Sequence, residues 1–477
     1  MSSSSCPHTT LLTTPSPNAA LAGYTQPAPQ KRVAATTASG RAHKDAQAPS
    51  PWTFPAPLIL PEDELSFDPS YPPQSFRSWK QEKERNPVTP ERKTIYIAAP
   101  PDVDATEAYI REWARSPKLD RTNGDIAQPC AKDIVEYLAA FYYPLPVRLL
   151  PALFRLTTWD DLRSLKSKSK STPPAVIKHV ALAHGDPCTR IRVRMTKQGV
   201  YTHQLNLNDL LDAAIESLPD DAYAILLLVD HDIYESDDDD FACGRAYGGS
   251  RVAVVSSARY HPGLDTEQGL EREHAWPASH CSAYVRQMCE GAGDDNPRPK
   301  KKKKKASKIW DDHEPGPADS PLQAAISALA VPPTSKSLIG ATTNLLYLSR
   351  LALTSSHELG HCFGLDHCVY YACLMDGAAS LAEDIRGAPY LCAICTVKVG
   401  AAGEEASEMN GDGAAVTRGK GKPWVKDAIA VTSRAELERN RRLHTLCIRW
   451  EAGDMFRAFG AWLGARIAEL EEELKEE

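Results

Sequence analysis

The chain has 477 residues, 55 Lys+Arg against 62 Asp+Glu for a formal net charge of -7, and 42% hydrophobic residues. The length suits about three domains, but the apolar fraction lies below that of ordinary globular domains, so we expect one sizeable core beside long unpacked segments. The slightly acidic balance argues against a globally basic nucleic-acid or membrane-surface protein. The longest apolar runs have strand length and are too short to span a bilayer.

The first part of the chain is poor in core-forming residues. Of the 37 prolines, 16 fall in the first 100 positions, among many Ser, Thr and Ala residues. Such a composition buries too little apolar surface to offset the entropy of ordering, so residues 1–90 are predicted to be disordered. The start lacks the basic and apolar regions of a secretory signal, which predicts a cytoplasmic or nuclear protein, or both. In those reducing compartments the 12 cysteines are not expected to form a disulfide framework.

A regular α/β pattern begins near residue 94. Short β-branched, aromatic or continuous apolar runs predict strands at 94–98, 146–150, 191–194, 222–229, 241–247 and 251–257. Apolar residues at three- and four-residue spacing predict helices at 134–141 and 210–218. Gly248 and Gly249 are placed to form the turn between the last two strands. Strands alternating with helices indicate an α/β fold with a mixed sheet.

Three later segments depart from this pattern. Residues 265–320 hold Gly, Pro, Asp and the run Lys300–Lys305, and we interpret them as a surface insertion. The lysine run is predicted to be solvated and disordered, with a nuclear import signal or a nucleic-acid contact as alternatives. A short helix is predicted to start at Pro321. Residues 401–425 are predicted to be a linker, and 426–477 a C-terminal helical segment, which leaves one folded domain over 91–400.

The most informative motif starts at His357. On a helix, side chains four residues apart share a face, so His357 and His361 can present two imidazoles to one Zn²⁺. Glu358 lies one residue round the helix, where its carboxylate can take a proton from a zinc-bound water. This combination predicts a hydrolytic metal site.

The residues after the helix supply a third ligand. Gly364 can adopt the left-handed conformation that ends a helix in a sharp turn, which brings His367 back toward the metal. Three protein ligands leave the fourth position of a tetrahedral zinc site for water, as catalytic zinc requires.

Four cysteines follow directly. Cys368, Cys373, Cys392 and Cys395 form two pairs separated by a loop, which fits a closed structural Cys₄ zinc site. Free buried cysteines and disulfides are the alternatives. Met375 follows Cys373 by two residues, and we predict that it forms the hydrophobic floor beneath the catalytic zinc, with an ordinary core methionine as the alternative.

These residues together resemble the archaemetzincin family. The family pattern H-E-x-x-H-x-x-G-x-x-H, then C-x₄-C-x-M and C-x-x-C, matches His357 through Cys395 at every fixed position. The resemblance implies a metzincin-type catalytic domain over 91–400, with a five-stranded mixed sheet packed on an active-site helix. It further implies a Met-turn at Met375, two zinc ions per chain, and zinc-dependent peptidase activity that is sometimes aminopeptidase-like.

We therefore expect a zinc metallopeptidase that acts on a peptide or protein, with Glu358 as the base and the peptide paired along 241–247. A catalytically idle zinc-binding scaffold and a DNA-associated metalloprotease are the two alternatives. A membrane partner is not expected and nucleic acid is disfavoured. The natural substrate, the oxyanion-stabilising residue and the oligomeric state are not predicted by the sequence.

Overall fold

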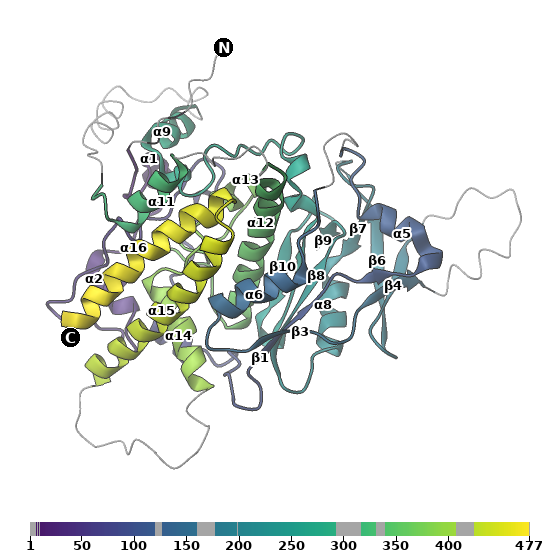
Figure 1. Cartoon of the computed structure of the whole chain (residues 1–477), viewed down its shortest axis with the longest axis horizontal. Coiled ribbons are helices and arrows are strands. Elements are labelled where there is room, and N and C mark those ends of the chain that lie inside the picture. The colour runs from purple at the N-terminus through teal and green to yellow at the C-terminus, as the bar shows by residue number, and fades with distance from the viewer. Residues whose placement is uncertain are drawn as a thin grey trace, which may run out of the picture.

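The computed structural model describes residues 6, 8, 10–119, 126–159, 177–197, 199–291, 316–330, 339–406 and 424–476, which fold around two β-sheets with helices on either side (Figure 1). The predicted mixture of α and β structure is confirmed. The run Lys300–Lys305 lies outside the described residues, so its predicted disorder stays a prediction. Among the described helices, none combines the length and apolarity needed to cross a bilayer.

The first sheet has five strands, and each falls on a run that the sequence predicted. In spatial order they are β10 (Gly244–Tyr247), β11 (Val252–Ser256), β8 (Ala222–Val229), β1 (Thr94–Ala98) and β3 (Val147–Leu149). Strand β10 pairs antiparallel with β11, and the other neighbours pair in parallel. The sheet is therefore mixed, and β10 forms one of its edges.

Alternate side chains of this sheet pack against different layers. Leu226 and Leu228 of β8 belong to a core shared with helices α6 (Ala131–Phe141) and α12 (Ile339–Cys362). Ile225 and Leu227 point to the opposite face and pack with α8 (Leu207–Glu216). Because all eight residues of β8 are buried, the strand is apolar throughout and not alternating. Helix α12 is consequently fixed against the sheet beside β10.

The second sheet was largely missed by the sequence analysis. Its six strands are β2 (Asp102–Val103), β4 (Arg155–Thr158), β5 (His179–Ala183), β6 (Cys188–Met195), β7 (His203–Asn206) and β9 (Ile233–Tyr234). Only the alternating β6 was predicted. The others have two to five residues, too few for a period of two to stand out.

The C-terminal part is helical, as predicted. Helices α11 (Pro321–Leu329), α14 (Ala393–Glu405), α15 (Trp424–Arg449) and α16 (Asp454–Glu476) gather on the side of α6 and α12 that faces away from the second sheet (Figure 1). The predicted linker needs a correction at its start, because 401–405 belong to α14, where Val399 and Ala402 are buried. Residues 407–423 lie outside the described part of the chain.

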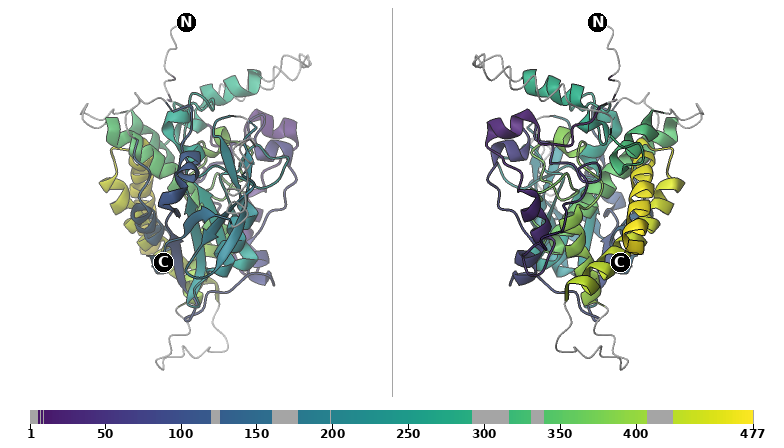
Figure 2. Two further views of the ribbon diagram at one scale, coloured as in Figure 1. Left: turned by 90° about the vertical axis from the view of Figure 1, so that its right-hand side faces the viewer. Right: turned by 90° about the vertical axis from the view of Figure 1, so that its left-hand side faces the viewer.

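The expected disorder of residues 1–90 is also corrected. The described residues there form α1 (Pro17–Ala22), α2 (Pro29–Ala35), α3 (Glu64–Phe67) and α4 (Phe76–Gln81), on the side of the molecule opposite the C-terminal helices (Figure 2). Trp79 is fully buried, and its indole N–H donates to the carbonyl of Phe363 at 2.8 Å. Few apolar residues suffice here because they pack on distant parts of the chain instead of on one another. A composition average cannot detect such packing.

The predicted insertion at 265–320 is ordered at both described ends. Trp276 and His280 are buried, residues 282–291 form helix α9 (Ser282–Gly291), and Ser320, the N-cap of α11, is buried. Residues 265–291 therefore combine exposed positions with buried ones, again because scattered apolar residues pack on other segments. Residues 292–315 lie outside the described residues.

A buried ion pair fixes the approach to β10. Arg259 and Asp232 are 1% and 0% exposed, and the guanidinium donates to the carboxylate at 2.7 and 2.8 Å while lying over the ring of Phe241. Replacing Asp232 by Ala should lower the free energy of unfolding by about 3–5 kcal/mol, because the guanidinium loses its buried partner. Urea denaturation measures this loss. Asp186→Ala, at an exposed position in the β5–β6 turn, is the control, and equal stability of the two variants would contradict the prediction.

Candidate metal centres and active site

The last turns of α12 bring two histidines together. His357 and His361 lie on the same face, with their Nε2 atoms 3.0 Å apart and their ring centroids 4.8 Å apart. The helix positions them because residues four apart are neighbours on its surface. Their predicted proximity is observed.

The helix ends at a glycine that turns the chain. The N–H of Leu365 donates to the carbonyl of Gly360 at 3.1 Å, and the N–H of Gly364 donates to that of His361 at 2.9 Å, which is a Schellman motif. Gly364 has a φ of +76°, and a Cβ there would lie 2.9 Å from Cγ of Arg85. Any other residue would therefore be strained.

This turn returns His367 to the other two histidines. Its ring centroid lies 5.4 Å from that of His357 and 5.1 Å from that of His361. One donor atom of each of the three lies within 4.8 Å of the others. Among the described residues, no further His, Cys, Asp or Glu joins this group. The arrangement provides three protein donors, as an open zinc site requires.

Each histidine is oriented through its other nitrogen. Nδ1 of His357 donates to the carbonyl of Leu374 and Nδ1 of His361 to that of Leu365, both at 2.7 Å. Nδ1 of His367 lies 2.8 Å from a carboxylate oxygen of Glu64. Such partners fix the tautomer and leave Nε2 with its lone pair available for a metal.

The protonation of the buried histidines also suits a metal. Burial, aided by the neighbouring histidines, lowers the pKa of His357 and lowers that of His361 to about 4. Both imidazoles are then neutral near pH 7, and the neutral form is the one that binds zinc. The donor set therefore fits Zn²⁺.

Glu358 lies beside this group on α12. Its side chain is 8% exposed, and burial, with a smaller effect of the Asp384 charge, raises its pKa to about 8 in the metal-free chain. A divalent cation close by would favour the ionised form and lower that pKa. The site therefore combines three imidazoles with a neighbouring buried carboxyl group.

Met375 lies directly beneath the motif. Its side chain is fully buried, and its carbonyl accepts a 2.7 Å hydrogen bond from the N–H of Cys368. A Cβ on Gly360 would lie 2.4 Å from the Met375 sulfur, so the thioether occupies the space that this glycine leaves between the two helical histidines. The contact is the one expected of a hydrophobic floor.

Two cavities meet beside His357 and His367. Their volumes are about 560 and 540 Å³, and both are lined by Gly244, His357, Glu358 and His367. The first continues along β10 to Gly248, and the second reaches back to Phe241 and across to residues 376–388. The site therefore lies in a cleft that extends in both directions along the edge strand.

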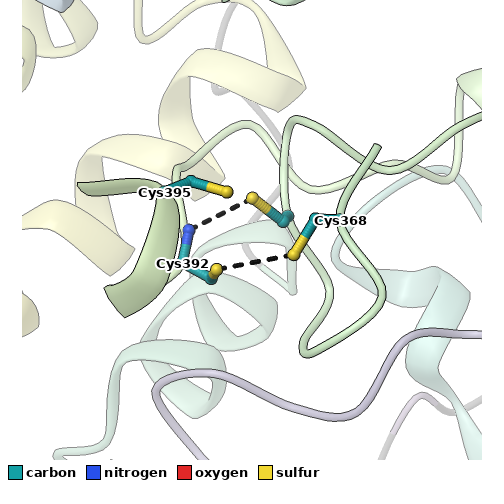
Figure 3. Close-up of side chains that lie close together, drawn as sticks. Cys368, Cys392 and Cys395 are labelled. Atoms are coloured by element: carbon teal, nitrogen blue, oxygen red, sulfur yellow. Dashed lines mark hydrogen bonds between the residues drawn. The ribbon is translucent and has the colours of Figure 1, made fainter. Parts of the chain in front are cut away.

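The four cysteines form a second, closed group. Cys368 follows the third histidine, Cys373 lies in the next loop, and Cys392 and Cys395 lie at the start of α14. All four are buried, and their sulfurs lie within 4.8 Å of one another (Figure 3). The sulfurs of Cys368 and Cys392 are 3.6 Å apart, longer than the 2.05 Å of a disulfide. Four converging thiols away from solvent fit a structural Zn²⁺.

The sequence analysis missed the residues of the N-terminal region that contact the turn from Gly364 to His367. Besides Glu64, Gln74 donates to the carbonyl of Gly364 at 2.9 Å and accepts from the N–H of Asp366 at 3.2 Å. All of them come from the region predicted to be disordered. The isolated Trp79 was the one available signal, since a large aromatic side chain seldom remains in solvent.

Comparison with known proteins places the chain among related sequences. The model of peptidase family M54 matches residues 326–401. Human archaemetzincin-2 is 24% identical over 345 residues, covering 72% of this chain and 69% of that protein. The archaemetzincin of Methanopyrus kandleri is 47% identical over 51 residues, 11% of this chain and 29% of that protein.

Solved structures give a weaker comparison. The crystal structure of the Methanopyrus kandleri archaemetzincin has a TM-score of 0.29 and 16% identity, covering 65% of this chain and 96% of that one. A zinc-dependent peptidase from Methanocorpusculum labreanum has a TM-score of 0.27 and 16% identity, covering 64% and 99%. The sequence matches support the resemblance seen in the motif: residues 326–401 match peptidase family M54, and this chain is similar to archaemetzincins.

Proposed function

We propose that the protein hydrolyses peptide bonds at the site formed by His357, His361, His367 and Glu358. The observation that carries this proposal is the convergence of three oriented imidazoles beside a buried carboxylate. The floor formed by Met375 supports a Met-turn, and the four buried thiols support a second, structural zinc.

The three histidines and Glu358 would have different roles in the reaction. The histidines would hold a zinc ion, which when bound would supply Lewis-acid chemistry toward the substrate carbonyl and a water molecule. Glu358 accepts the proton of the attacking water and later delivers it to the leaving amine nitrogen. A carboxyl group with a raised pKa suits both steps, because neither its ionised nor its neutral form is strongly disfavoured near neutral pH.

The substrate would pair with β10. An edge strand offers unpaired backbone groups to an extended peptide, and β10 borders both cavities. The second cavity is lined by eight carboxyl groups, those of Asp63, Glu64, Asp239, Asp240, Glu358, Asp376, Glu383 and Asp384. Carboxylates of this lining such as Asp239 and Asp240 would favour a cationic group, either a Lys or Arg side chain or, in aminopeptidase-like cleavage, the peptide's amino terminus.

A peptide-library assay tests the proposal. The zinc-loaded chain should cut peptides that carry Lys or Arg next to the scissile bond at least 10-fold faster than matched peptides with Glu there, and removal of zinc should abolish cleavage. Blocked and free amino termini separate internal from aminopeptidase-like cleavage. No zinc-dependent cleavage in the library would reject the peptidase proposal and favour the idle scaffold, although no described residue closes the fourth metal position.

Glu64 would act as a positioning residue for His367. Glu64→Gln should weaken zinc binding at the three-histidine site by about 10–100-fold, because a neutral amide holds the imidazole less firmly than a carboxylate does. Competition with a chelator measures the affinity. Glu62→Gln, at an exposed position two residues earlier, is the matched control. Equal zinc affinity in the two variants would rule out the role.

The cysteine chemistry bears on location. A Cys₄ zinc site needs reduced thiolates, and reduced thiols persist in the cytosol and nucleus. We therefore propose that the protein works in one or both of these compartments.

A further inference from the structure

A third group of metal-binding side chains lies where the start of the chain meets residues 271–284. One donor atom each of Cys6, His8 and His274 lies within 4.8 Å of the others. The sulfur of Cys6 is also 3.1 Å from that of Cys281, which adjoins this group without being part of it. None of these residues belongs to the two centres described above.

Backbone pairing holds the two segments together. The N–H of Leu12 donates to the carbonyl of His280 at 2.7 Å, and the N–H of Ser282 donates to that of Thr10 at 2.9 Å. Leu11 and Cys281 form an antiparallel bridge. Both are almost fully buried, so the neighbouring cysteines and histidines are brought together by ordered structure.

His8 and His274 each have one ring nitrogen without a hydrogen-bond partner among the described residues. His274 is 9% exposed, and its Nδ1 lies 2.9 Å from the carboxylate of Glu271. Nε2 of His274 and Nε2 of His8 are both buried and have no hydrogen-bond partner among the described residues. A buried polar atom without a partner costs roughly 1–3 kcal/mol, so such atoms call for an explanation. The carboxylate on His274 repeats the arrangement of Glu64 on His367, in which Nδ1 is occupied and Nε2 is left for a metal.

We propose that Cys6, His8 and His274 bind a third zinc ion, with the thiol of Cys281 beside Cys6 completing the ligand set on binding. Two sulfur and two imidazole donors are the ligand set of closed, tetrahedral structural zinc sites, and thiolate with imidazole disfavours Mg²⁺ and Ca²⁺. The ion would satisfy both orphaned imidazole nitrogens. The role is structural, and it does not depend on the proposed peptidase function.

The site would anchor the region that reaches the three-histidine centre. The ring of His274 stacks on that of Tyr284 at 4.0 Å. Tyr284 in turn interacts with Arg386, whose guanidinium pairs with Asp63 at 2.6 Å. Asp63 precedes Glu64, the partner of His367. Zinc at the third site therefore stabilises the surroundings of the N-terminal segment that orients one ligand of another metal.

Metal analysis of the full chain tests the proposal. The double variant Cys6→Ser/His8→Ala should contain one zinc fewer per chain than the wild type by mass spectrometry of metals. The matched control is Cys130→Ser/His43→Ala, which changes an exposed cysteine and an exposed histidine and should keep the full zinc content. Equal zinc content in the wild type and the Cys6/His8 variant would overturn the proposal.

A measurement on the wild type decides the case in which that variant does not fold. With zinc bound, Cys6 should resist alkylation, and it should react once a chelator is added without reductant. Alkylation before chelation would show a free thiol. Alkylation only after reduction would show a disulfide between Cys6 and Cys281. Either result would overturn the third site.

Discussion

Replacing Glu358 by Ala should lower kcat/KM for peptide cleavage by about 10²–10⁴-fold while the zinc content stays unchanged. Among the described residues, Glu358 is the carboxyl group that borders both cavities and lies beside the three histidines, and burial raises its pKa to about 8. Its loss removes general base and general acid catalysis together. Initial rates on a cleaved library peptide, with metal analysis of the same sample, measure the two effects.

The matched control is Glu451→Ala, which removes an exposed carboxylate outside both cavities. It should leave the rate and the zinc content as they are. If Glu358→Ala retained wild-type turnover, the proton would have another acceptor and the proposed mechanism would be wrong. If it lost zinc, its effect on rate would reflect the metal site and not proton transfer.

Replacing Cys392 by Ser should have the largest effect on stability. It removes one of four buried thiols that come from two separate segments, and the metal-binding free energy of such a site is folding free energy. We expect loss of one zinc and a decrease of at least about 4 kcal/mol in the free energy of unfolding. Because Cys368 follows His367 directly, the affinity for the catalytic zinc should fall as well.

Denaturant titration and metal analysis measure these changes, with the exposed Cys130→Ser as the control. A Cys392→Ser chain that kept its full zinc content and its stability would show that the four cysteines are ordinary buried thiols. The converse treatment, mild chelation of the wild type, should reproduce the variant's loss of stability.

The sequence was most informative where chemistry restricts spacing. His357, His361, Gly364 and His367 could be assigned because a helix and a glycine turn permit few ways to bring three imidazoles together. The strands of the five-stranded sheet were equally clear, since β8 and β11 are continuous apolar runs. The role of His357, His361 and His367 as metal ligands remains a prediction, and so do the domain boundaries.

The sequence failed where the decisive partner lies far along the chain. Glu64 has no local pattern, and its contact with His367 spans 303 residues. Cys6 and His8 are separated from His274 in the same way, so spacing could not link them. The order of the N-terminal region was missed for this reason, because composition describes how well a segment packs on itself.

The contacts between the N-terminal region and the end of α12 also determine the order in which these parts can pack during synthesis. Trp79 is made 284 residues before Phe363, whose carbonyl its indole binds. At about 5–20 residues per second, the N-terminal region leaves the ribosome about 15–60 s before its docking surface exists. Until then its apolar side chains have nothing to cover them. The nascent chain should therefore be a chaperone client and sensitive to proteases until its last third has emerged.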